Sequence, residues 1–385
     1  MTDTARHPSA AHRGGDGLGK GGRVRKQEQQ PASDEVVEVA PGVLRMQLPI
    51  QFTGLGHVNM YGLVDRDGLA VVDPGMPGRQ SWQAVVAALR RAGYRPTDVH
   101  TVVITHSHPD HFGGALRLAR EADADIVAHA AFTVPWLAAT EPDVASLEDG
   151  DDLIGTTGMA VRDPSGLRVP WRAPDDAMRP PQLPQSLPRP VVKLAWRLGR
   201  RYLQVPTPTR PLTDGAAVRL AGRDWFAVHT PGHTADHLCL HDPEQRLLLA
   251  GDHVLPTITP HVSGIGCGRD PLRQYLDALD TVAHLDVGLV LPAHGHPFAD
   301  LAARTTEIAR HHDERLDRLR QIAAADGPST VEAFSRALFP PGQWGLMAES
   351  EVFAHLEHLR RDGSARAWRH DGALVYDLAE EGARP

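Results

Sequence analysis

The sequence has few of the features that mark several large classes of protein. Only two of its 385 residues are cysteine, Cys239 and Cys267, so it predicts neither a disulfide framework nor a zinc site made of thiolates. No run of about 18 apolar residues occurs, so we expect no membrane-spanning segment. Acidic residues outnumber basic ones by 48 to 40, and the net charge of −8 argues against a general affinity for nucleic acid.

The N-terminal 35 residues lack an apolar stretch as well. They contain glycine and charge but no hydrophobic region of a secretory signal. They also offer too little apolar surface to offset the entropy lost on ordering. We therefore expect residues 1–35 to form a disordered tail. Without a signal, a membrane span or a disulfide framework, a cytoplasmic location is the simplest expectation.

From Val36 onward the sequence contains a regular alternation of strand-like and helix-like segments. Short β-branched runs bounded by glycine predict strands, and apolar residues at helical spacing predict helices between them. The pattern is interrupted near residue 140, resumes at Ala217 and continues through a long helix over Leu301–Ala325. This order of elements predicts a layered α/β domain over residues 36–326.

An irregular stretch interrupts this domain over residues 140–211. It is rich in proline, arginine and tryptophan, and one helix is predicted near residues 191–201. So long an insertion in a compact domain is typical of a functional lid or of a disordered segment. We expect a lid that helps to select the substrate.

The character of the sequence changes again over residues 327–385. Helix patterns cover Thr330–Leu338 and Glu349–Arg361, and a hairpin is predicted to turn at Asp371 and Gly372. Two helices followed by a two-stranded wing predict a winged-helix-like C-terminal module.

Histidine is the abundant residue, with 22 copies, and three of them lie in the stretch TVVITHSHPDHFGG, residues 101–114. His106 and His108 stand two apart after a predicted strand, so their side chains project to the same side and can share one ion. Asp110 and His111 follow a turn made by proline and can face a second ion nearby. Imidazole and carboxylate groups are suitable ligands for zinc, and also for iron or manganese.

Three more ligand-type residues stand at predicted strand ends, His233 in TPGHT, Asp252 in AGDH and His294 in PAHG. A carboxylate such as Asp252 can bridge two cations. The predicted sites are His106, His108 and His233 for one metal, Asp110, His111 and His294 for the other, and Asp252 for both. Each ion keeps room for a water, which a catalytic site requires.

Other histidines are interpreted differently, because a lone histidine at a strand end is more often a hydrogen-bonding residue than a metal ligand. This interpretation covers His229, His237, His241, His253 and His261. His237 and His253 remain candidates to line the pocket.

The ordered set of motifs DPG, HSHPDH, PGHT, GDH and PAHG resembles the metallo-β-lactamase-fold hydrolase superfamily over about residues 36–300. The resemblance implies an αββα sandwich with a dinuclear metal site, here two zinc ions, at the sheet edges. It also implies that Asp73 of the DPG motif orients a histidine ligand or the site loop. The C-terminal module is similar to that of lactamase-β-like hydrolases and endoribonucleases. The GHVN stretch at Gly56–Asn59 and the insertion resemble glyoxalase-II-like hydrolases.

The implied activity is hydrolysis by a hydroxide that bridges two metals, because two cations lower the pKa of bound water toward neutrality. Asp252 and Asp110 are the predicted catalytic residues, with Asp110 or a pocket histidine as the proton relay. A small-molecule thioester, ester or lactone is the expected substrate.

Several alternatives stay open beside this expectation. A phosphodiesterase or endoribonuclease would use the same metals, but the acidic net charge and the acidic start of ESEVFAHLEHLRR disfavour it. The C-terminal module is therefore interpreted as a packing or dimerisation piece, and a homodimer as a partner to test. Asp252 and the missing signal disfavour a true β-lactamase. An iron dioxygenase that acts on persulfides shares the HxHxDH motif, and a non-catalytic binding protein is disfavoured because no expected ligand is missing.

Overall fold

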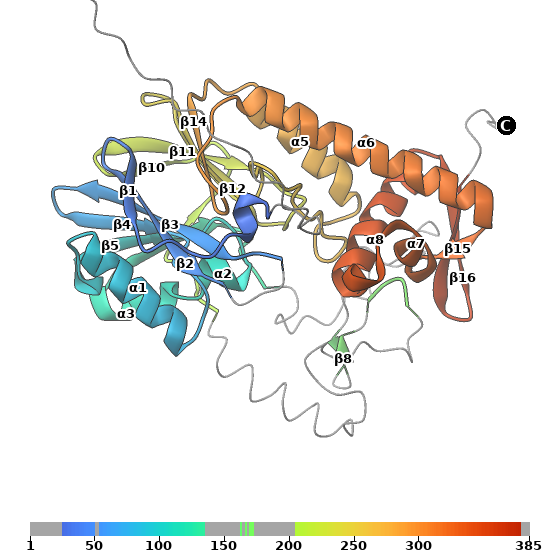
Figure 1. Ribbon diagram of the computed structural model, residues 1–385, viewed down its shortest axis with the longest axis horizontal. Coiled ribbons are helices and arrows are strands. Elements are labelled where there is room, and N and C mark those ends of the chain that lie inside the picture. Colours follow the sequence, from blue (N-terminus) through green and yellow to red (C-terminus); the bar gives the residue numbers. More distant parts are fainter. Residues whose placement is uncertain are drawn as a thin grey trace, which may run out of the picture.

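The computed structural model describes residues 25–50, 54–134, 162–163, 166–167, 169–172 and 205–378. Figure 1 shows layered sheets at one end of the molecule, a mainly helical module at the other, and the long helix α6 running between them. Within these residues, none of the helices has both the length and the apolar character needed to cross a membrane.

The first sheet has seven strands in the order β1-β2-β3-β4-β5-β6-β9. Their bounds are Val36–Ala40 (β1), Val43–Pro49 (β2), His57–Asp65 (β3), Gly68–Val72 (β4), Val99–Val103 (β5), Asp125–His129 (β6) and Arg210–Leu212 (β9). The first four strands pair antiparallel, and β4, β5, β6 and β9 pair in parallel. Strands β4 to β6 are buried along most of their length, which explains why their sequences are nearly unbroken apolar runs.

The second sheet has five strands in the order β10-β11-β12-β13-β14. Their bounds are Ala217–Leu220 (β10), Arg223–His229 (β11), Leu238–Asp242 (β12), Leu247–Gly251 (β13) and Leu289–Pro292 (β14). All neighbours pair antiparallel except β13 and β14, which are parallel. Trp225, Leu240 and Leu249 of this sheet pack against Val72 and Val103 of the first, so the two sheets enclose one apolar layer.

Helices cover the outer faces of both sheets. Their bounds are Arg79–Arg91 (α1), Pro109–Phe112 (α2), Ala115–Ala122 (α3), Pro271–Ala283 (α5) and Leu301–Asp326 (α6), with short 3-10 turns at Gln27–Gln29 (η1) and Pro96–Asp98 (η2). Leu89 and Leu118 of α1 and α3 pack with the first sheet, and Leu272 and Leu279 of α5 pack with the second. Helix, sheet, sheet, helix is the predicted αββα order, which is thereby confirmed.

Two glycines let the start of α3 approach the loop that follows β4. A Cβ atom on Gly113 would lie 2.0 Å from the backbone nitrogen of Pro77, and one on Gly114 would lie 2.4 Å from the carbonyl oxygen of Pro74. Both distances are far below van der Waals contact, so larger residues would push the two loops apart. The DPG motif and the HSHPDHFGG motif are therefore packed directly together.

The C-terminal module contains the two helices and the hairpin that the sequence predicted, together with a further short strand and a 3-10 turn. Their bounds are Ser329–Thr330 (β15), Val331–Leu338 (α7), Pro341–Gln343 (η4), Leu346–Arg361 (α8), Ala365–His370 (β16) and Ala373–Leu378 (β17). The three strands pair in the order β15-β17-β16. Phe334, Val352 and Leu356 form the module's core with Leu319 and Ile322 of α6, so the module is tied to the sandwich by α6.

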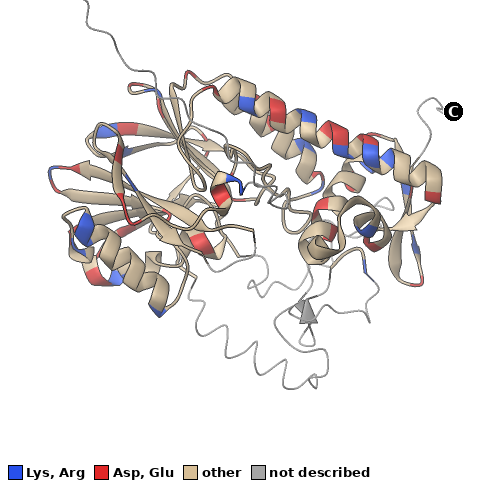
Figure 2. Ribbon diagram, in the orientation of Figure 1, with Lys and Arg blue, Asp and Glu red and all other residues tan. Residues whose placement is uncertain are grey.

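Basic and acidic residues alternate along α6 (Figure 2). Arg310 and Glu314 form an ion pair one helical turn apart, and so do Arg320 and Asp317. Exposed pairs of this kind contribute little stability each, typically well below about 1 kcal/mol. They mark the solvent side of a helix whose other side is apolar.

The predicted insertion, residues 140–211, is described only in part. Its described pieces are Arg162–Asp163 (β7), Gly166–Leu167 (β8), residues 169–172 and residues 205–211. Residues 210 and 211 belong to β9. Trp171 is buried, and its Nε1 donates to Glu349 of α8, which Arg172 also binds through two hydrogen bonds of 3.0 and 2.7 Å. This part of the insertion is anchored on the C-terminal module. The helix predicted near residues 191–201 lies outside the described residues, and the lid stays a prediction.

Residues 25–35 correct the prediction of a disordered tail over residues 1–35, of which residues 1–24 lie outside the described part. They include η1 and pack on the sandwich, with Glu28 fully buried. Composition alone could not show this, because the partners of Glu28 are polar groups of Thr257 and Ile258, 229 and 230 positions away.

Candidate metal centre

All seven predicted ligand-type residues meet at one edge of the sandwich. His106, His108, Asp110 and His111 follow β5, His233 lies between β11 and β12, Asp252 follows β13, and His294 follows β14. The two sheets are joined at this edge, where the Leu238 N–H donates to the carbonyl oxygen of Thr105 at 2.9 Å. Strand ends that are far apart in the sequence therefore present their loops to a common point.

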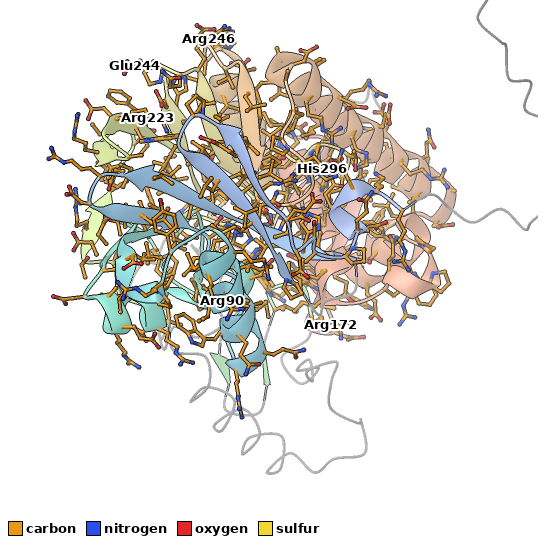
Figure 3. All side chains as sticks on the ribbon, turned by 60° about the vertical axis from the view of Figure 1, so that its left-hand side comes forward. Arg90, Arg172, Arg223, Glu244, Arg246 and His296 are labelled. Carbon is orange, nitrogen blue, oxygen red and sulfur yellow. The ribbon has the colours of Figure 1, made fainter. Side chains whose placement is uncertain are left out.

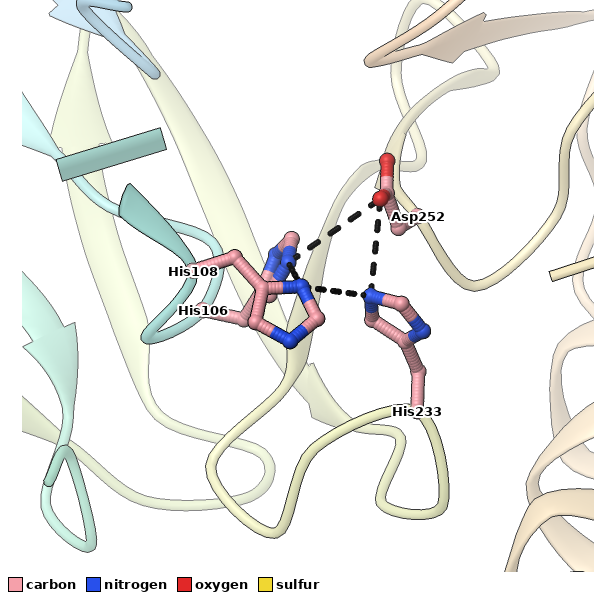
Figure 4. A group of neighbouring side chains, drawn as sticks. All are labelled: His106, His108, His233 and Asp252. Atoms are coloured by element: carbon pink, nitrogen blue, oxygen red, sulfur yellow. Dashed lines mark hydrogen bonds and ion pairs between the residues drawn. The ribbon is translucent and has the colours of Figure 1, made fainter. Parts of the chain in front are cut away.

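The first group of side chains consists of His106, His108, His233 and Asp252 (Figure 4). The Nδ1 of His108 lies 3.0 Å from the Nε2 of both His106 and His233. The Oδ2 of Asp252 lies 4.0 Å from the Nε2 of His106 and 3.4 Å from that of His233. Nitrogen ligands of a tetrahedral zinc ion lie about 3.3 Å apart. The group has the size and the donor atoms to hold such a cation.

The second group consists of Asp110, His111 and His294. The Oδ2 of Asp110 lies 3.6 Å from the Nε2 atoms of both histidines. Asp252 borders this group too, with its Oδ2 3.7 Å from His111 Nε2 and its Oδ1 3.2 Å from His294 Nε2. Asp252, a member of the first group, therefore also lies against the second.

Within the part of the chain that the structure describes, three buried atoms at the meeting point of the groups have no hydrogen-bond partner of acceptable geometry. They are the Nε2 atoms of His111 and His294 and the Oδ1 of Asp252. Leaving a buried donor or acceptor unpaired costs about 1–3 kcal/mol each. A bound cation would satisfy all three, so the residues present fit a metal.

Burial controls the charge of two histidines in the first group. It lowers the pKa of His106 and His108 well below the ordinary value, and neighbouring histidines lower both further. Both side chains are therefore neutral, which is the form of imidazole that binds a metal.

The second group is electrostatically different. Burial opposes the charged forms of His111 and His294, but nearby carboxylates, first Asp110 for His111 and Asp252 for His294, raise their pKa values above the ordinary one. Burial also opposes the charged form of Asp252, yet the histidines around it hold its pKa well below the ordinary value. Protons must therefore leave this group when a metal binds.

A sequence model of the metallo-beta-lactamase superfamily matches residues 53–294, which is more than half of the chain. The chain belongs to the metallo-beta-lactamase superfamily. A solved metallo-beta-lactamase family protein from Thermus thermophilus has 27% sequence identity and a TM-score of 0.65, and the match covers 89% of this chain and 100% of that one. A beta-lactamase domain protein from Burkholderia ambifaria has 27% identity and a TM-score of 0.66, over 90% and 96% of the two chains.

Relatives in this superfamily include the probable metallo-hydrolase YqjP of Bacillus subtilis, 22% identical over 87% of this chain and 97% of that protein. The lactamase-like protein aptB of Emericella nidulans is 34% identical over 113 residues, which are 29% of this chain. The match covers only 34% of the fungal protein. Superfamily membership, together with the histidine and aspartate groups, makes the chain a metallo-beta-lactamase-fold hydrolase and indicates a divalent metal.

Asp73, in the DPG loop, supports both groups of side chains. Its Oδ2 accepts from His111 Nδ1 at 2.9 Å and from the Thr105 hydroxyl at 2.8 Å, and its Oδ1 accepts from the Thr105 N–H at 2.9 Å. The Thr105 hydroxyl in turn lies 3.1 Å from His106 Nδ1. One carboxylate therefore orients a histidine of each group, and it does both things that the sequence analysis left as alternatives.

Main-chain carbonyls orient two further histidines. His233 Nδ1 donates to the carbonyl oxygen of His261 at 2.7 Å, and His294 Nδ1 donates to that of His57 at 2.6 Å. His237 accepts from the Asp252 N–H through Nε2 at 3.0 Å, so its proton sits on Nδ1, which faces the Thr230 hydroxyl. His237 is thus a hydrogen-bonding residue, as the sequence suggested, but one that holds the backbone of Asp252.

Two supporting residues were missed by the sequence analysis. His57 belongs to the GHVN stretch, and its isolated position at a strand start offered no ligand pattern. Glu28 lies in the segment that was assigned to the tail. Neither has a local signal, because the groups that they contact come from distant loops.

Proposed function

We propose that the chain hydrolyses thioesters or carboxylic esters, lactones included, and that it works with two zinc ions. The observation that carries this proposal is the pair of side-chain groups built around one shared carboxylate. A pair of adjacent metal sites is the arrangement that hydrolases use to activate water and polarise a substrate oxygen.

Each proposed histidine ligand has one ring nitrogen that faces the other members of its group. His108 would bind through Nδ1, since that atom faces His106 and His233, and the other histidines would bind through Nε2. The proposed ligands are His106, His108 and His233 for the first ion, Asp110, His111 and His294 for the second, and Asp252 for both.

When bound, the two ions would supply a water of lowered pKa and would polarise the carbonyl oxygen of the substrate. Asp252 would keep the two groups at a fixed separation, because its two oxygens face different histidines. Asp110 is suited to accept and pass on a proton, since its side chain keeps 11% of its surface exposed beside His111 and His294. We assign to Asp110 the delivery of that proton to the leaving thiolate or alkoxide.

Two observations support an acyl substrate over a nucleic acid. An Aspergillus fumigatus relative named atrochrysone carboxyl ACP thioesterase is 31% identical over 118 residues, although this chain covers only 26% of that protein. Helix α8, the candidate recognition helix, is buried along most of its length and pairs its acidic residues within the protein, including Glu349 with Arg172 and Glu351 with Arg315. It therefore serves packing rather than the binding of phosphates.

The test is metal analysis joined to a substrate screen of the purified full chain. We expect about two transition metals per chain, and zinc-dependent turnover of acyl-glutathione, acyl-CoA or lactone substrates. Phosphodiesters and RNA belong in the same screen, as does oxygen consumption with a persulfide. Cleavage of RNA with inert thioesters, or oxygen uptake with iron, would overturn the proposal in favour of those activities.

A further inference from the structure

The segment of residues 25–30 lies between two loops that each carry a proposed metal ligand. One loop leads from Asp252 to Ile258, and the other contains His294 and His296. Lys26 donates from Nζ to the carbonyl oxygen of Thr257 at 2.8 Å, and Gln27 accepts from the His296 N–H at 2.8 Å. His296, labelled in Figure 3, is therefore a point of contact between this segment and the loop that carries His294.

Glu28 is the centre of these contacts and has no exposed surface. Its Oε1 accepts from the backbone N–H groups of Thr257 at 2.7 Å and Ile258 at 3.1 Å, and its Oε2 accepts from the Thr257 hydroxyl. A buried carboxylate is costly unless several donors satisfy it. The three donors come from one short loop, so the carboxylate specifies the position of that loop.

The same loop is held from its other side by Arg304 of α6. Arg304 donates to the carbonyl oxygens of Leu255 and Ile258, each at 2.7 Å. A carboxylate on the N–H groups and a guanidinium on the carbonyls leave the loop after Asp252 little freedom. Glu28 lies near the start of the described chain and Arg304 lies in α6, so this clamp joins two parts that are distant in the sequence.

The segment also reaches the second loop through His57. The Gly295 N–H donates to His57 Nε2 at 3.1 Å, so the proton of His57 sits on Nδ1 and is donated to the Gln30 carbonyl at 2.8 Å. The carbonyl oxygen of His57 accepts from His294 Nδ1. A Cβ atom on Gly295 would lie 3.3 Å from the Glu28 side chain, which shows how closely the two pack.

We propose that residues 25–30 help to hold the proposed metal ligands in place, and that Glu28 is a positioning residue for Asp252 and His294. The inference rests on the proposed function, since it concerns the metals that those residues would bind. Glu28 acts through the two loops, and it does not touch the reacting atoms.

The test compares Glu28→Gln with Glu35→Gln in the full chain. Both variants remove one negative charge from the same N-terminal stretch, but Glu35 is exposed. Glutamine at position 28 keeps the volume and loses one acceptor oxygen. We expect one of the two metals to bind about tenfold more weakly in Glu28→Gln, as for other residues that orient a ligand. The thermal unfolding midpoint of the chelator-treated protein measures separately how each substitution changes the stability of the metal-free fold.

The competition of each variant with a chelator gives both metal affinities, and the absorption spectrum of the cobalt-substituted protein reports the geometry of each site. In Glu28→Gln we expect a changed spectrum and a lower kcat with little change in KM, while Glu35→Gln matches the wild type. Unchanged metal affinities, spectrum and kcat in Glu28→Gln would overturn the inference, even if the unfolding midpoint falls.

If Glu28→Gln does not fold, Thr257→Val provides the same test from the other side of the contact. It removes only the hydroxyl donor to Glu28 and keeps the backbone donors. A wild type that holds no metal would defeat the proposed function itself. A wild type with two metals beside an unaffected Glu28 variant would defeat only this inference.

Discussion

The two halves of the candidate metal centre differ in the side chains that form them and in the pKa values of their histidines. Three imidazoles form the first half, and the Nε2 atoms of His106 and His233 each lie 3.0 Å from His108 Nδ1. Burial lowers the pKa of His106 and His108 well below the ordinary value. The second half contains Asp110 and two histidines whose pKa values neighbouring carboxylates raise. Among the described candidate ligands, Asp252 is the one that contacts both halves. A change within one half should therefore affect one metal, whereas a change at Asp252 should affect both.

The largest effect is expected for Asp252→Ala. Loss of the shared carboxylate should remove at least one metal and lower kcat/KM by more than about 100-fold, beyond the effect of a residue that only orients a ligand. Metal analysis and steady-state kinetics on a substrate identified in the screen measure both. Retention of two metals with wild-type activity would show that the halves are not joined by Asp252.

A paired comparison of His233→Ala and His294→Ala separates the halves. Each variant should keep roughly one metal per chain, because each removes a ligand from one site only. The absorption spectra of the two cobalt-substituted variants should differ from each other. Their sum should reproduce the absorption spectrum of the cobalt-substituted wild type. Loss of both metals in both variants would mean that the two sites form only as a unit.

A smaller effect is expected for Asp73→Asn, which keeps the shape of the side chain and removes its charge. His111 and Thr105 would lose a charged acceptor, so the second half should bind its metal about 10- to 100-fold more weakly. Chelator competition measures this loss. The exposed Asp224→Asn is the matched control, and equal affinities in the two variants would contradict the assigned role.

The smallest effect concerns stability, at a contact far from the metal residues in the sequence. The hydrogen bond to Asp270 raises the pKa of His358, and His358 holds the pKa of Asp270 below its ordinary value although burial opposes this. The contribution of charged His358 is complete below about pH 6.5 and is lost as pH rises through its raised pKa. That of Asp270 is present above about pH 3.9 and is lost as pH falls through its lowered pKa.

The thermal unfolding midpoint should be measured at about pH 5.5 and about pH 8.5, which lie on either side of the histidine's titration. Between these two values the midpoint of the wild type should fall more than the midpoint of His358→Gln. Metal content should be equal in the two proteins. A pH dependence that is the same in both would show that the pair does not stabilise the fold, and a change in metal content would connect α8 to the metal centre.

The sequence predicted much of the fold because its signals are local. Strand β4 and helix α3 are short segments whose own pattern of apolar residues and glycines decides their type. The long helix predicted over Leu301–Ala325 is observed as α6, Leu301–Asp326. The seven candidate ligands were found for a related reason. Few residue types can bind a metal, and they stand in recognisable motifs at the ends of predicted strands.

The sequence could not predict the residues that support the site. The sequence around Glu28 indicates a polar tail, and the sequence around His57 indicates only the start of a strand. Their roles depend on carbonyl and N–H groups of the loops at residues 255–258 and 292–296, which reach them only after the sheets have stacked. No periodicity encodes such contacts.

The sequence by itself therefore determined the kind of chemistry, a hydrolase site of histidines and aspartates on a layered α/β scaffold. The tertiary structure decided which nitrogen of each histidine faces its neighbours, with Nδ1 for His108 and Nε2 for His106 and His233. It also decided that the N-terminal segment packs beside the site. Both outcomes follow from hydrogen bonds between distant backbone and side-chain groups, which exist only in the folded chain.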